Sequence, residues 1–156
     1  SAGTSQPFIG PQGLPITKPP YGRITAIDIQ TGEHVWMSAV GRGPVDHPAL
    51  AHLDLPDLGW ANRSFAVATS TLLLVASQDP QSLSNQRRGS RSALGSQPAY
   101  LRAYDLDTGA LIGQVALPGY ASGSLMSYMV AGRQYVAVLV GSRRSGPELL
   151  VLALPR

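Results

Sequence analysis

The sequence predicts an all-β protein built from repeated four-stranded antiparallel units. The main observation is a repeated turn, because RITAIDIQTGEHVW (residues 23–36) and YLRAYDLDTGALIG (residues 100–113) each hold two short apolar runs joined by Asp-x-x-Thr-Gly. One such turn indicates only a local bend, whereas two copies in similar surroundings indicate a repeated structural unit. The second observation is that apolar residues show little helical periodicity anywhere in the chain.

The composition supports this fold class. The chain has 156 residues, enough for one domain with a sizeable core, and it is 44% apolar and 13% charged with 17 glycines and 13 prolines. A helical bundle would need more Glu, Lys and Ala. The net charge of +3 is too small to indicate nucleic-acid binding, and the absence of cysteine excludes disulfides, thiolate zinc sites and covalent haem.

The sequence was also searched for a membrane span and for a signal peptide, and it shows neither. No apolar run approaches the roughly 20 residues of a membrane span. Because the chain starts at Ser1 and carries no signal peptide, we expect a processed product or a piece of a longer protein.

Nine short strands are expected after an irregular lead-in at residues 1–22, which is rich in Gly, Pro, Ser and Thr. Residues 23–29 and 34–40 form the first hairpin, in which Asp28 accepts amide hydrogen bonds and Gly32 supplies the positive φ of a bulged turn. The other expected strands are Ser64–Thr69, Leu72–Ser77, 100–106, 110–117, Leu125–Val130, Gln134–Val140 and Glu148–Leu154. A polar insertion at 78–98, rich in serine and arginine, lies between the expected strands Leu72–Ser77 and 100–106.

Named by their place in a four-stranded unit, these strands run C-D, A-B-C-D, A-B-C. A four-stranded antiparallel unit that repeats with this C–D turn is a β-propeller blade. The chain is therefore expected to form a fragment of about two blades, with residues 23–156 belonging to a single larger domain. The alternative is that two unrelated hairpins of a β-sandwich share the turn by coincidence.

Several segments, in order along the chain, resemble the C-terminal end of quinoprotein dehydrogenases, and the membrane-bound glucose dehydrogenase type in particular. They are GLPITKPPYGRITAIDIQTGEHVW, DHPAL, LDLPDLG, YLRAYDLDTG, LPGYASGSLMSYMVAGRQYVAV and LLVLALP, which run from about Gly13 to the end. The Trp-docking motif of that family is similar to Ala26, Asp28, Thr31, Gly32 and Trp36. The second copy keeps Ala103, Asp105, Thr108 and Gly109 but has Gly113 at the tryptophan position.

The resemblance implies an eight-bladed propeller that binds pyrroloquinoline quinone (PQQ) and a divalent cation of the calcium type at its mouth. It implies that a sugar, polyol or alcohol is oxidised with an aspartate as general base, and that electrons pass to a quinone or cytochrome. The catalytic and metal-binding residues of the family lie upstream of the matched region. None is therefore assigned to this chain, and the isolated chain is expected to be inactive.

The resemblance also implies a location and partners. The complete protein is expected to be periplasmic and attached to the inner membrane through a segment outside this chain. The remaining propeller blades would be its partners, together with the substrate and the electron acceptor.

In a propeller, the B–C and D–A loops share the cofactor face. Here these loops are residues 38–63, 78–99, 118–124 and 141–147. Four residues in or beside them are candidates for cofactor binding: Trp60, Asn62, Asp79 and Arg143. Trp60 could stack on the quinone or fill an inter-blade core, and Asn62 lies beside it at the start of an A strand.

The two charged candidates depend most on the family. Asp79 matches an aspartate at the end of a B strand, where it would hydrogen-bond the cofactor or hold a loop. Arg143 and Arg144 stand where glucose enzymes carry Gly-Gly-His, and a guanidinium pairs well with planar carboxylates such as those of PQQ. For both positions, a solvated loop residue is the alternative.

Two other groups of residues suggest chemistry more weakly. A metal-site hypothesis rests on His47, His52, Asp46, Asp54 and Asp57, but the prolines around them favour a meandering loop. Ser122 lies next to a glycine, although its surroundings do not fit Gly-x-Ser-x-Gly and no triad partners are placed.

Two functions therefore remain open. The chain could hold the C-terminal blades of a PQQ-dependent dehydrogenase, or it could belong to a non-catalytic propeller of PQQ-like repeats that serves as a scaffold. An aspartate base and metal-binding carboxylates upstream of Ser1 would favour the enzyme.

The sequence also predicts two structural features. Trp36 should wedge between blades, so that Trp36→Ala costs on the order of 3–5 kcal/mol. The strand at Glu148–Leu154 should present an unpaired edge that invites self-association, because the prolines of residues 1–22 would interrupt a ladder beside it.

Overall fold

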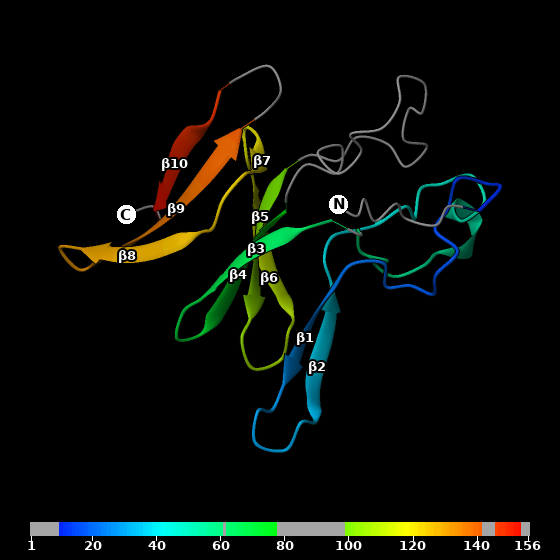
Figure 1. The fold of residues 1–156 in the computed structure, drawn as a ribbon, viewed down its shortest axis with the longest axis horizontal. Coiled ribbons are helices and arrows are strands. Elements are labelled where there is room, and N and C mark those ends of the chain that lie inside the picture. The colour runs from blue at the N-terminus through cyan, green and yellow to red at the C-terminus, as the bar shows by residue number, and fades with distance from the viewer. Residues whose placement is uncertain (1–9, 61, 78–98, 142–145, 154–156) are drawn as a thin grey trace, which may run out of the picture. The chain divides into compact units, whose positions relative to one another are not determined.

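The computed structural model describes residues 10–60, 62–77, 99–141 and 146–153 (Figure 1). These residues fall into two compact units. The first unit contains the described residues up to Asn62, and the second contains those from Arg63 onward. The described residues form ten strands and one short 3-10 helix, Ala51–Leu53, which confirms the all-β prediction.

The first unit contains a hairpin of β1 (Arg23–Ile27) and β2 (His34–Ala39), which pair antiparallel with a bulge between Ala26 and Ile27. The turn between them has the chemistry that its sequence predicts. The Asp28 carboxylate accepts hydrogen bonds from the backbone amides of Gln30 and Thr31, and Gly32 has a φ of +75°. Residues 28 and 29 therefore belong to the turn and not to the strand.

The second unit contains a complete four-stranded sheet. Its order is β3 (Ser64–Ala68), β4 (Leu72–Ser77), β5 (Tyr100–Asp105) and β6 (Leu111–Ala116), with every neighbour antiparallel. This is the predicted A-B-C-D unit. The turn between β5 and β6 repeats the first one, because the Asp105 carboxylate accepts hydrogen bonds from the amides of Asp107 and Thr108.

A second sheet of this unit is built around β9 (Arg133–Gly141). β10 (Glu148–Ala153) pairs along one side of β9, and β7 (Tyr120–Ala121) and β8 (Met126–Val130) pair in succession along the other. The strands β8, β9 and β10 are the predicted A-B-C unit. β7 is a finding that the sequence did not predict, because those residues were expected to be loop; it extends the A position past a break at residues 122–125.

A hydrophobic core joins the two sheets of the second unit, which lie on opposite sides of it (Figure 1). Leu74, Ala76 and Leu101 contribute from the first sheet, and Val138 and Val140 from the second. In β4 and β5 both faces are buried, as the burial of Val75 and Tyr104 on the opposite face shows. The continuous apolar run of β4 has the composition expected for a strand covered on both faces.

The two turn motifs differ at the tryptophan position. Trp36 lies half-buried on β2, opposite Ala26. At Gly113, an added Cβ atom would meet nothing within 4 Å, so this corner lacks a side chain where the first copy has an indole. Whether Trp36 wedges between blades stays a prediction.

Candidate cofactor-binding site

The described residues include two of the four candidate cofactor-binding residues. Trp60 and Asn62 lie at the end of the first unit and are both half-buried. Asp79 and Arg143 lie outside the described residues, as do Arg144 and the arginines of the insertion.

A short backbone ladder holds Trp60. The amide of Leu58 donates to the carbonyl oxygen of Arg42 at 2.9 Å, and the amide of Trp60 donates to that of Val40 at 3.0 Å. The chain beyond β2 is therefore paired antiparallel with the segment that returns at residues 58–60, and the loop between them is closed at its base. This ladder explains how a tryptophan at the end of a long proline-containing loop acquires a fixed backbone position.

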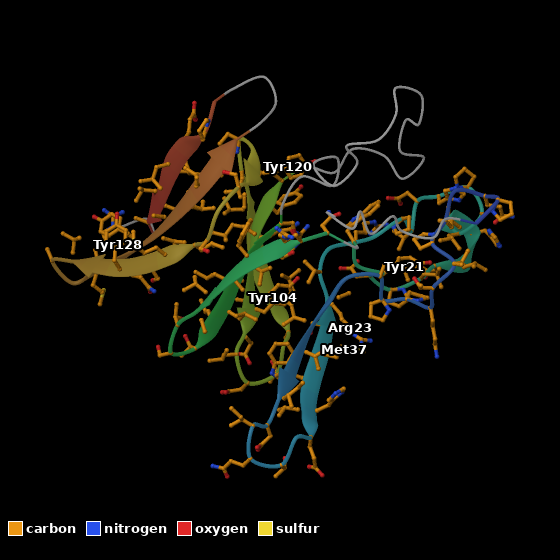
Figure 2. All side chains as sticks on the ribbon, viewed as in Figure 1. Tyr21, Arg23, Met37, Tyr104, Tyr120 and Tyr128 are labelled. Carbon is orange, nitrogen blue, oxygen red and sulfur yellow. The ribbon has the colours of Figure 1, made fainter. Side chains whose placement is uncertain are left out.

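Two glycines make this ladder possible by letting three backbone segments approach each other closely. A Cβ atom built on Gly22 would lie 2.6 Å from the carbonyl carbon of Trp60 and closer still to its oxygen, and one built on Gly59 would lie 2.9 Å from the carbonyl carbon of Gly22. The φ of Gly59 is +67°, which L-residues rarely adopt. The segment before β1 joins the same ladder through Tyr21, labelled in Figure 2, whose amide donates to the carbonyl oxygen of Leu58 at 2.7 Å.

Beyond the ladder, the backbone turns so that the amide of Asn62 donates to the carbonyl oxygen of Trp60 at 2.7 Å. A half-exposed indole offers a flat apolar surface to a planar ring system. A primary amide offers both a donor and an acceptor. Both side-chain types can contact a planar heterocycle that carries oxygen atoms.

The loop inside this ladder carries the residues of the metal-site hypothesis, and local bonds already engage two of them. The Nδ1 atom of His47 accepts a hydrogen bond from the amide of Ala49 at 3.2 Å, and the carboxylate of Asp46 pairs with the guanidinium of Arg42 at 3.3 Å. That pairing raises the pKa of Arg42, first through the hydrogen bond and then through the charge of Asp46. In the part of the chain that the structure describes, no group of three or more His, Cys, Asp or Glu side chains is arranged to hold a metal ion.

The candidate D–A loop of the second unit, residues 118–124, contains the short strand β7 and Ser122. The amide and the hydroxyl of Ser122 both donate to the carbonyl oxygen of Leu139, at 2.8 and 3.3 Å. Ser122 therefore anchors the break between β7 and β8 to β9, which is a structural role. Tyr120, labelled in Figure 2, packs against the hydrophobic core.

The turn aspartates are the carboxylates with perturbed titration in the described residues. The pKa of Asp28 is lowered mainly by the hydrogen bond from the backbone of Thr31, and that of Asp105 mainly by the hydrogen bond from the side chain of Thr108. Both groups are exposed parts of turns, so the shifts reflect turn geometry and not a catalytic site.

Arg102 is a buried charged residue that was not predicted from the sequence. It lies in the middle of β5 with 6% exposure, and its guanidinium carbon lies 5.2 Å from the centre of the Tyr100 ring. Its side chain thus runs toward the start of β5, the same end of the sheet at which β3 starts and β4 ends, where Ser64 and Ser77 contact at 3.3 Å. Strand alternation in YLRAYD could have revealed this residue, because it places an arginine on one face with two tyrosines.

Comparison with known proteins shows to which protein family this architecture belongs. Four-stranded antiparallel units with matching C–D turns define a β-propeller protein. The family model "PQQ: Glucose/ethanol/alcohol dehydrogenase, beta-propeller domain" matches residues 1–136. The chain therefore belongs to the β-propeller family of PQQ-dependent glucose, ethanol and alcohol dehydrogenases.

Individual relatives agree with this assignment. The chain is 29% identical over 97% of its length to the quinoprotein glucose dehydrogenase of Escherichia coli (strain K12). It is 30% identical over 92% to the glycerol dehydrogenase large subunit of Gluconobacter oxydans (strain 621H). It is 29% identical over 90% to the quinate/shikimate dehydrogenase (quinone) of Acinetobacter baylyi (strain ATCC 33305 / BD413 / ADP1). The chain spans only 16–18% of the length of these relatives.

The resemblance to quinoprotein dehydrogenases and the propeller fold are thus confirmed. Among the described residues, no helix has the length and hydropathy of a membrane span.

Proposed function

We propose that this chain forms part of a PQQ-dependent dehydrogenase that oxidises a sugar, polyol or alcohol and passes the electrons to a quinone or cytochrome. The observation that carries the proposal is the family match over residues 1–136, together with relatives named as glucose, glycerol and quinate dehydrogenases. When bound, PQQ supplies the oxidant of the reaction. The complete protein would be periplasmic and attached to the inner membrane.

In this proposal, the role of the described residues is to bind and orient the cofactor. The indole of Trp60 provides an apolar surface for its ring system, and the ladder beneath keeps that surface in place. Asn62 would hydrogen-bond to oxygen atoms of the cofactor or of a neighbouring loop. Asp79 and Arg143 are proposed as further cofactor-binding residues, Asp79 by hydrogen bonding and Arg143 because a guanidinium pairs well with carboxylates such as those of PQQ. A divalent cation of the calcium type and the general base would be held by residues outside this chain.

The remaining blades of the complete protein would be the partners of this chain. We propose that residues 23–156 form part of one propeller domain, after a lead-in at residues 1–22. A further blade would cover the exposed apolar face of the sheet β8–β9–β10, where Met126, Val130 and Leu139 are exposed.

The test is to compare the 156-residue chain with the complete protein, each supplied with PQQ and calcium. We expect dye-linked oxidation of glucose, glycerol or quinate by the complete protein and none by this chain alone, because general-base catalysis needs a positioned base. In the complete protein, Trp60→Phe should weaken PQQ binding while Trp36→Phe should leave it unchanged. A complete protein that neither binds PQQ nor oxidises these substrates would favour the alternative, a non-catalytic propeller scaffold.

A further inference from the structure

One face of the sheet β3–β4–β5–β6 carries a group of polar side chains at one end. Each strand contributes one of them: Ser64, Ser77, Arg102 and Gln114. Directly opposite residues in antiparallel strands share a face, and the register pairs Ser64 with Ser77 and Arg102 with Gln114. Val75 joins the two pairs, because it lies opposite Arg102 and alternates with Ser77 along β4. All four side chains therefore lie on the face that points away from the hydrophobic core.

This polar group lies at the rim of a buried surface. Further along the same face, Val75 is 1% exposed and Tyr104 is 2% exposed. Ser64 and Gln114, by contrast, are exposed, and Ser77 is half-buried. A charged group from outside the sheet could therefore reach this end of the face.

Arg102 is the charged member of the group. It is 6% exposed, and its guanidinium carbon lies 5.2 Å from the centre of the Tyr100 ring, toward the end of the sheet where Ser64 and Ser77 contact. The ring favours the flat face of the cation but does not engage the five N–H donors, which lie in its plane. Among the described residues, no hydrogen bond or ion pair engages this guanidinium.

The described residues of this sheet supply no carboxylate to Arg102. Asp105, the next acidic residue along β5, lies on the opposite face, and its carboxylate already accepts hydrogen bonds from the amides of its own turn. Removing an unpaired guanidinium from water is unfavourable, so buried charges in proteins are normally paired. The four polar residues thus have donors without an acceptor.

We propose that Arg102, Ser64, Ser77 and Gln114 form a binding site for one carboxylate group. Arg102 supplies the positive charge and two parallel N–H donors. The two serines share one hydrogen bond at 3.3 Å, which leaves one hydroxyl hydrogen to donate to the ligand. Gln114 supplies an amide donor from the neighbouring strand.

The charge and shape of the site favour a carboxylate over other anions. A single guanidinium balances one negative charge, which a carboxylate carries and a phosphate group exceeds at neutral pH. The planar fork of the guanidinium also matches the two oxygen atoms of a carboxylate. This inference does not depend on the proposed function.

The test measures hydrogen exchange of the β5 amides in the 156-residue chain at neutral pH, because both tryptophans lie in the first unit and cannot report on this sheet. We expect exchange to be about tenfold slower in about 100 mM acetate than in chloride of equal ionic strength, which corresponds to a dissociation constant of about 10 mM. Acetamide, which has a similar shape and no charge, should not slow exchange.

Two variants localise the effect. Arg102→Met should abolish the response to acetate. Arg133→Met is the matched control, because the guanidinium carbon of Arg133 also lies near a tyrosine, 5.6 Å from the centre of the Tyr135 ring, but on the other sheet of the unit. It should leave the response unchanged.

The same measurement on the complete protein distinguishes two sources of the carboxylate. If the ligand is a free small acid, the complete protein also responds to acetate. If it is an acidic side chain outside the described residues, the β5 amides are already protected in chloride, and Arg102→Met exchanges faster than Arg102→Lys, which keeps the charge. A role in packing alone would give the reverse order, because methionine fills the space without a buried charge.

Two results would overturn the proposal. One is that acetate slows exchange equally in the wild-type chain and in Arg102→Met. The other is that neither the chain nor the complete protein responds to acetate while Arg102→Met exchanges no faster than Arg102→Lys.

Discussion

The crossing of Gly22 and Gly59 predicts a large effect for a single added methyl group. In Gly22→Ala, the new Cβ atom would lie 2.6 Å from the carbonyl carbon of Trp60, although carbon atoms in contact stay about 3.5–4.0 Å apart. The obstacle is backbone and not the end of a flexible side chain. The two segments must therefore separate by about 1 Å.

That separation breaks the ladder that holds Trp60. Three hydrogen bonds depend on the close approach: Val40 N–H to Gly22 at 2.9 Å, Trp60 N–H to Val40 at 3.0 Å and Tyr21 N–H to Leu58 at 2.7 Å. Stretching each by about 1 Å takes it beyond hydrogen-bond distance, at a net cost of about 1 kcal/mol each. We expect Gly22→Ala to lower the free energy of unfolding of the first unit by about 3 kcal/mol.

The assay is urea denaturation followed by tryptophan fluorescence, which reports on this unit because Trp36 and Trp60, the two tryptophans of the chain, both belong to it. The matched control is Gly113→Ala, since an added Cβ atom there meets nothing within 4 Å. Gly113 belongs to the second unit, so Gly113→Ala should leave the tryptophan transition of the first unit unchanged. If Gly22→Ala unfolds at the same urea concentration as the wild-type chain, the close backbone approach is not a constraint and the argument fails.

Three further predictions follow from other parts of the structure. The pKa values of Asp28 and Asp105 are lower in the folded chain than their ordinary 3.8, so their contribution to stability is present above about pH 4 and is lost as the pH falls below it; Asp105→Asn should flatten the acid limb of a stability–pH curve. Trp36 is only half-buried in this chain, so Trp36→Ala should cost about 2 kcal/mol in urea denaturation, less than for a fully buried indole. Arg102 is buried, and among the described residues its guanidinium contacts only the Tyr100 ring. Arg102→Met should therefore raise the free energy of unfolding by about 1 kcal/mol, whereas a free energy below that of the wild-type chain would contradict this prediction and indicate a counter-ion.

The sequence was sufficient to predict the strands because each is short, apolar and bounded by residues with a defined turn chemistry. The two Asp-x-x-Thr-Gly turns are the best case. An aspartate that accepts two amide hydrogen bonds and a glycine with positive φ are local features, and neither needs information from a distant part of the chain. β7 could not be predicted in the same way, because two residues are too few to show any alternation.

The candidate site was less predictable because its geometry depends on contacts between distant residues. Trp60 was a reasonable candidate from its position alone, but nothing in the sequence indicates that its carbonyl group lies against Gly22. Arg102 was missed for a different reason. A charged residue inside an apolar strand is normally expected on an exposed face, whereas β5 is buried on both faces.

The strands β4, β9 and β10 have similar sequences but differ in how far their two faces are buried. The segments LLLVAS, YVAVLV and LLVLA are equally rich in apolar residues, and composition alone predicts that all of them are covered on both faces. In β4 this is so, but in β9 and β10 the side away from the core leaves Leu139, Leu149 and Val151 exposed. Because the three strands have similar apolar sequences, the difference in exposure comes from what packs against each sheet and not from the strands themselves. The sheet β8–β9–β10 therefore has the sequence of an interior layer, but among the described residues its face away from the core is an exposed apolar surface.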